Sequence, residues 1–160
     1  MLSWQRRHGV AFHLLFDSGE HRRPSEGKER GTLVSLNVGL TMSEKPDIVI
    51  RREAGCVVVE FAVPRISEGT IVEAIQTTLT QLIENDPQQK IVIDFQRVEL
   101  MSSATLGVLV RFYRDLAENG GRIVLCGLQP PVQKVFELTR LDQLFRIEKD
   151  LAAGLSRLAG

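Results

Sequence analysis

Short apolar runs alternate with segments of helical period from residue 47 to the C-terminus, and this alternation is the strongest constraint on the fold. Five runs have the length and composition of β-strands: residues 47–52, 56–61, 90–95, 122–126 and 144–147. The segment Glu53-Ala54-Gly55 between the first two indicates a hairpin. Four helical patterns occupy the intervals that follow. Strands joined by crossover helices predict an α/β fold with a small mixed, mostly parallel sheet of about five strands, flanked by about four helices in the order β-β-α-β-α-β-α-β-α.

Local signals mark where these helices begin. Thr70-x-x-Glu73 has the pattern of a capping box, in which the two side chains would satisfy backbone N–H groups ahead of the first helix. Pro130 and Pro131 suit the first turn of the third helix, because proline has no N–H that would be left unpaired there. The last helix is expected from about Asp150.

Two adjacent serines, Ser102 and Ser103, lie between the apolar run at 90–95 and the helical pattern behind them. Backbone N–H groups and the helix dipole at a helix N-terminus favour a hydroxyl, a carboxylate or a phosphate. Serine is also among the commonest helix caps, so the pair by itself indicates a structural cap far more often than a regulatory site. Asp94, at the end of the preceding strand, could hydrogen-bond the serine turn. Its preferred role is to accept hydrogen bonds from loop N–H groups, and direct contact with a binding partner is the alternative.

Composition and motifs argue against several classes of function. Twenty basic residues balance twenty acidic ones, so the basic excess of a nucleic-acid binder is missing, and no apolar run is long enough to cross a membrane. All three histidines lie before residue 22 at spacings that suit neither a catalytic triad nor a metal site. The P-loop and GxGxxG patterns are absent. We therefore expect no catalytic residue, metal or cofactor.

The cysteines indicate the cellular location of the protein, and the N-terminal segment indicates where its domain begins. Cys56 and Cys126 lie inside apolar runs and are expected to be buried and reduced, which favours a cytoplasmic location. Residues 1–44 include the charged, glycine- and proline-containing stretch HRRPSEGKERG. We interpret 1–44 as a disordered or mis-annotated extension, with Met42 as an alternative start, and 45–160 as one domain.

The serine turn and the C-terminal half resemble the STAS domain of bacterial anti-sigma factor antagonists. That family shows a strand ending in Asp, then an apolar residue, Asp-Ser, one or two small residues and Leu-Gly. The matching positions here are Asp94-Phe95, Val98, Met101, Ser102-Ser103, Ala104-Thr105 and Leu106-Gly107. The stretch GGRIVLCGLQPPVQKVFELTRLDQLFRI is also similar to the family's second half, so the resemblance covers about residues 46–155.

This resemblance implies a docking protein switched by phosphorylation and not an enzyme. In phosphoregulated members the serine after the Asp is phosphorylated by an anti-sigma factor that is itself a kinase, and the unphosphorylated protein binds that kinase and frees the sigma factor. The implied phosphoacceptor is Ser103, with Ser102 as second choice. The implied partner is a serine-protein kinase of the histidine-kinase-like ATPase type. Its expected contacts are Met101, Ser102, Ser103, Ala104, Thr105, Leu106 and Arg111.

Two positions depart from the family pattern. Ser102 stands where the family has Asp, and Thr105 stands where glycine is common. Loss of the Asp removes a hydrogen-bond acceptor that could orient the neighbouring hydroxyl. The alternative function is therefore a non-switching structural STAS subunit, either of a stress-sensing complex or of a lipid-transporting ABC system.

Overall fold

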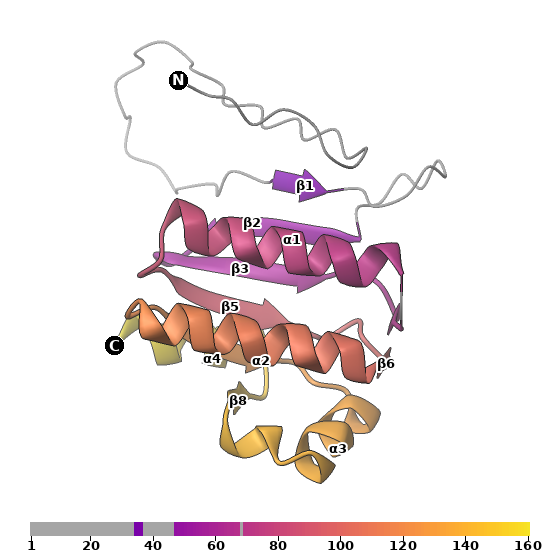
Figure 1. Ribbon diagram of the computed structural model, residues 1–160. Coiled ribbons are helices and arrows are strands. Elements are labelled where there is room, and N and C mark those ends of the chain that lie inside the picture. The colour runs from indigo at the N-terminus through magenta and orange to yellow at the C-terminus, as the bar shows by residue number, and fades with distance from the viewer. Residues whose placement is uncertain (1–33, 37–46, 68) are drawn as a thin grey trace, which may run out of the picture.

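A six-stranded sheet forms the centre of the computed structural model, which describes residues 34–36, 47–67 and 69–160 (Figure 1). The strand order is β1-β2-β3-β5-β7-β8. The strands are β1 Val34–Leu36, β2 Ile48–Glu53, β3 Cys56–Phe61, β5 Lys90–Asp94, β7 Arg122–Cys126 and β8 Arg146–Glu148. The pairs β1–β2 and β2–β3 are antiparallel, and the other three pairs are parallel. The predicted mixed sheet and order of elements are confirmed, and β1 adds an edge strand from within the predicted extension.

Helices cover both faces of this sheet. The four helices are α1 Thr70–Asn85, α2 Ser103–Glu118, α3 Pro130–Leu138 and α4 Leu151–Ala159. Figure 1 shows α1 and α2 side by side on one face, where they contact each other, and α4 packs on the opposite face against β5 and β7. Among the described helices, none is both long and apolar enough to cross a membrane.

Alternation of side chains along the strands builds two separate apolar cores. Ile91 and Ile93 of β5 join the larger core under α1, α2 and α3, whereas Val92 between them joins the smaller core under α4. Burial on both faces explains why these strands are continuous apolar runs. Gly154 allows α4 to lie close to the sheet, because a Cβ there would be only 3.1 Å from Val92 Cγ1.

Most local signals are confirmed. Ala54 and Gly55 both have positive φ angles, 51° and 74°, and join β2 to β3 through the two-residue turn that matches the twist of a hairpin. Pro130 and Pro131 occupy the first turn of α3.

Two expectations about boundaries are wrong, and one pair of short strands was missed. Gly69, and not Thr70, is the N-cap of α1, and it has no side chain with which to bond a backbone N–H, so the capping box does not form. A short 3₁₀ turn, Leu141–Gln143, delays β8 until Arg146, two residues later than predicted. The parallel pair of two-residue strands β4 (Arg65–Ile66) and β6 (Leu100–Met101) was not predicted at all. Met42, the histidines and most of residues 1–44 lie outside the described residues.

Candidate functional site

The serine turn is held by a single backbone carbonyl from a distant part of the chain. Strand β6 leads into Ser102, and its partner β4 ends at Ile66. The carbonyl oxygen of Ile66 accepts a hydrogen bond from the Ser102 backbone N–H at 2.9 Å and a second from the Thr105 hydroxyl at 3.1 Å. Thr105 is completely buried, so the second bond is shielded from water. The start of α2 is therefore fixed to β4.

The two serines have different roles in this geometry. Ser102 is the N-cap of α2, with extended backbone, and its Oγ accepts the Thr105 backbone N–H at 3.4 Å and lies 3.2 Å from Thr105 Oγ1. Ser103 is the first helical residue and is exposed. Among the described residues its hydroxyl makes no hydrogen bond. One serine is thus used by the fold, while the other presents a free hydroxyl at the N-terminus of a 16-residue helix.

Burial changes the predicted contact surface. Ser103, Ala104 and Arg111 are exposed and Ser102 is half-buried, so these four can meet a partner. The side chains of Met101, Thr105 and Leu106 are also predicted contacts, but they are 7%, 0% and 7% exposed. In the free chain they pack in the core beneath the turn, and their contact with a partner stays a prediction.

Asp94 supports the loop before the serine turn and does not bond the turn itself. Its Oδ1 accepts the backbone N–H of Gln96 at 2.9 Å. Side chains alternate along β5, so Asp94 lies on the α4 face of the sheet while α2 covers the other face. Burial raises the pKa of Asp94, the Gln96 bond opposes this rise, and the nearby Glu60 carboxylate adds to it. The expected bond to the serine turn is therefore wrong, whereas acceptance of a loop N–H is confirmed.

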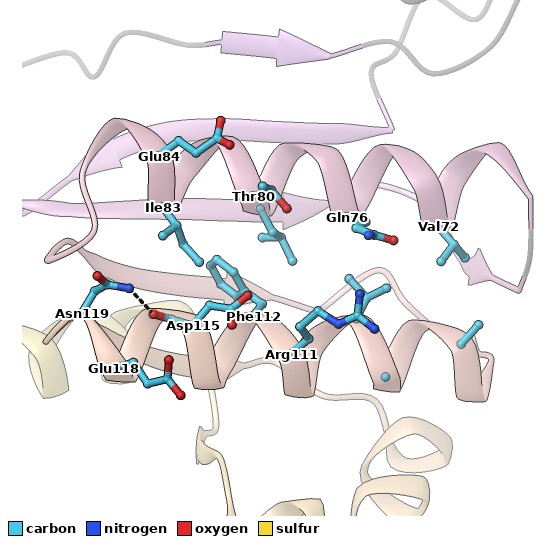
Figure 2. A pocket seen from close by; sticks show the side chains of 14 residues that line it. Val72, Gln76, Thr80, Ile83, Glu84, Arg111, Phe112, Asp115, Glu118 and Asn119 are labelled. Atoms are coloured by element: carbon cyan, nitrogen blue, oxygen red, sulfur yellow. Dashed lines mark hydrogen bonds between the residues drawn. The ribbon is translucent and has the colours of Figure 1, made fainter. Parts of the chain in front are cut away.

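A groove between α1 and α2 begins beside the serine turn and was not predicted (Figure 2). It has a volume of about 560 Å³. Ala104, which follows the serines in the chain, lines this groove. Figure 2 shows Arg111 along one rim. The other end carries carboxylates from both helices, Glu84, Asp115 and Glu118. The helical period of α1 and α2 could have located these residues, but the spacing of the two helices comes from tertiary packing.

The cysteines do not contribute a reactive group. Cys56 and Cys126 are both buried and unpaired with each other, as predicted. Burial raises the pKa of Cys126 to about 12, and the neighbouring carboxylates of Asp94 and Asp150 add to this effect. Within the ranges that the structure describes, no group of three or more His, Cys, Asp or Glu side chains is arranged to hold a metal ion.

The chain forms a small α/β domain with a mixed sheet and helices on both faces of that sheet. The domain is built around a strand–serine turn–helix unit, in which an exposed hydroxyl lies where α2 begins. The chain belongs to the STAS domain family, whose model matches residues 47–154.

Individual relatives agree with this assignment. BtrV of Bordetella bronchiseptica, named as a candidate anti-sigma factor antagonist, is 33% identical over 60 residues, which are 38% of this chain and 52% of BtrV. The match thus spans about half the length of that relative. The structure of an anti-sigma-factor antagonist (STAS) domain protein from Planctomyces limnophilus superposes with a TM-score of 0.63 at 26% identity, covering 70% of this chain and 97% of that one. The phosphorylated form of Bacillus SpoIIAA shares the fold, with a TM-score of 0.55 at 21% identity over 69% and 97% of the two chains.

Proposed function

We propose that this chain is an anti-sigma factor antagonist that binds an anti-sigma factor, releases the sigma factor, and loses this binding when Ser103 is phosphorylated. The observation that carries the proposal is that the two serines have different roles. Ser102 caps α2, whereas the Ser103 hydroxyl is exposed and makes no hydrogen bond to another described residue. The names of the relatives from Bordetella and Planctomyces support the partner class. In this reading the partner is a serine kinase of the histidine-kinase-like ATPase type, and this chain is a cytoplasmic binding protein without catalysis of its own.

The presence of Ser102 in place of the family's Asp is compatible with control of binding by phosphorylation of Ser103. A helix N-cap needs an oxygen that accepts a backbone N–H, and serine and aspartate are about equally good in this position. Ser102 supplies such an oxygen to Thr105. The loss of the Asp therefore changes the local charge and leaves the start of α2 in place.

A phosphate on Ser103 costs little free energy in the free protein but destabilises the complex with the partner. It adds a charge of roughly −1.5 to −2, next to the unpaired N–H groups at the start of α2, which favour anions. In the complex the same surface, which includes Ala104 and Arg111, is covered and loses its water. A penalty of about 3 kcal/mol in the complex would lower the affinity by about two orders of magnitude.

Binding of the purified anti-sigma kinase to wild-type, Ser103→Ala and Ser103→Asp proteins tests this proposal. Titration calorimetry is expected to give similar affinities for wild type and Ser103→Ala and a roughly hundredfold loss for Ser103→Asp. Ser156→Asp is the matched control, because Ser156 is an exposed serine on α4, on the other face of the sheet. Incubation with kinase and ATP, followed by peptide mass spectrometry, is expected to place phosphate on Ser103. Equal affinity of the phosphorylated and unmodified forms would contradict the proposal.

A non-switching structural subunit is the second candidate. Leu138, at the end of α3, is 76% exposed, and an apolar contact there would not depend on the charge of Ser103. Affinity purification from the native cell separates the two functions. Recovery of the same transporter or stress-complex subunits with wild type and with Ser103→Asp, without phosphate on Ser103, would favour this second function.

A further inference from the structure

Three arginines from three different elements meet in one depression at the end of the sheet away from the serine turn. Arg122 is the first residue of β7, Arg146 is the first residue of β8, and Arg157 lies in α4. The depression has a volume of about 290 Å³, and Tyr113 of α2 forms another part of its wall. We propose that this depression, hereafter the arginine pocket, binds the phosphoryl group of a phosphomonoester.

The wall of the arginine pocket is rich in hydrogen-bond donors. Arg122 and Arg146 are exposed, and neither takes part in an ion pair among the described residues. Arg157 Nε lies 3.6 Å from Glu148 Oε1, with both side chains partly open to water at 48% and 26% exposure. Such a pair contributes little to stability and yields readily to another anion. At least two of the three guanidinium groups are therefore free to bind.

Tyr113 adds a fourth donor. Its ring packs edge-to-face against Phe145, with centroids 5.3 Å apart and planes at 70°, which fixes its direction. The side chain is half-buried, and in the described part of the chain its hydroxyl has no hydrogen-bond partner. A tyrosine with this hydroxyl lines the same depression as the three arginines, and such a set of donors suits a ligand that carries several acceptor oxygens.

The charge and size of the pocket favour a phosphomonoester over other anions. Three guanidinium groups and the Glu148 carboxylate leave a formal local charge of +2. A phosphomonoester carries about −1.5 to −2 at neutral pH, and its oxygens match the fork of an arginine. The volume lies near the lower end of the range for ligand sites, roughly 300–1,000 Å³, so it admits one phosphoryl group with a small organic part. The half-buried apolar side chain of Leu144 also lines the depression and can contact that part.

Titration of the isotope-labelled full chain with inorganic phosphate, followed by NMR at low salt, tests the proposal. Saturable shifts are expected around residues 121–124, 144–147 and 157. Arg146→Gln is expected to weaken binding at least tenfold. Arg52→Gln removes the same charge from an exposed position on β2 and is expected to leave the affinity within twofold of wild type. Both arginines are exposed, so neither variant is expected to unfold the domain, and circular dichroism checks this.

The source of the phosphoryl group is distinguished by two further ligands, glycerol 2-phosphate and a phosphoserine peptide. Tighter binding of the first indicates a free small molecule, and tighter binding of the second indicates a phosphorylated segment of a protein; both results support the arginine pocket. Absence of saturation, shifts confined to the N-terminus of α2, or equal weakening by Arg52→Gln and Arg146→Gln would overturn the proposal. None of these results depends on the role of Ser103.

Discussion

The hydroxyls of Ser102, Ser103 and Thr105 are expected to contribute very differently to the free energy of unfolding, because they occupy very different environments. Thr105→Val keeps the shape of a fully buried side chain but removes its hydrogen bond to the Ile66 carbonyl. A buried bond of this kind contributes a net of about 0.5–1.5 kcal/mol. The Ile66 carbonyl retains its bond from the Ser102 N–H, so it is not left unpaired. We expect Thr105→Val to lower the free energy of unfolding by about 1 kcal/mol.

The two serines are expected to differ from Thr105 and from each other. Ser102→Ala removes the N-cap oxygen of α2, a change that typically costs 0.5–2 kcal/mol. The cap bond here is long, 3.4 Å, so the lower half of that range applies. Ser103→Ala removes an exposed hydroxyl without a partner among the described residues and is expected to change stability by less than about 0.5 kcal/mol.

Urea unfolding followed by circular dichroism at 222 nm measures these differences, with equal m-values required for the comparison. Thr77→Val is the matched control for Thr105→Val, because Thr77 is an exposed threonine of α1. A neutral Thr105→Val would show that the Ile66 carbonyl does not anchor the turn. A loss for Ser103→Ala as large as that for Ser102→Ala would show that the roles of the two serines are assigned incorrectly.

Three further predictions concern other parts of the domain. Gly121→Ala is expected to lower the free energy of unfolding by about 1–3 kcal/mol, because a Cβ would overlap the Leu116 side chain and lie 2.8 Å from the Pro87 carbonyl oxygen. Gly107→Ala, with open space around it in α2, is expected to be neutral or to add up to about 1 kcal/mol. Calorimetry showing the reverse order would refute this reading. Burial raises the pKa of Asp94, so its ionised form disfavours folding at neutral pH. Asp94→Asn should therefore unfold at a higher urea concentration than wild type at pH 7, and this difference should shrink as the pH falls through the raised pKa. A difference that grows on acidification would show that the ionised carboxylate stabilises the fold. With a pKa of about 12 and a buried side chain, the Cys126 thiol should react with Ellman's reagent at pH 8 only after unfolding, and rapid labelling of the native protein would show that it is accessible.

The order of strands and helices could be predicted because it depends on local patterns. The strand at 90–94 lies between two apolar layers, so its own composition reports its place at the centre of the sheet. Gly55 accepts the positive φ that the hairpin turn requires, and the prolines that begin α3 have a fixed φ that suits the first turn of a helix. The serine turn was located for the same reason, since a helix must begin where the helical period begins.

Local patterns could not predict which residue of the serine turn is buried, which one caps α2 and which one is exposed. Thr105 is buried by a bond to Ile66, a residue 39 positions earlier in the chain, and the strands that bring them together have only two residues each. Local propensity does not distinguish Ser102 as the cap from Ser103 as the free hydroxyl, because either serine could satisfy the same backbone N–H groups.

The class of fold and the position of the hydroxyl-bearing turn follow from short stretches of the chain, because both depend on periodicity and local backbone conformation. Tertiary structure alone decided which hydroxyl is free, which face of the sheet Asp94 occupies, and that Arg122, Arg146 and Arg157 share one pocket. The physical reason is that burial and the meeting of charges depend on contacts between residues far apart in the chain. Those contacts are set by the packing of helices on the sheet, and no short stretch of sequence contains them.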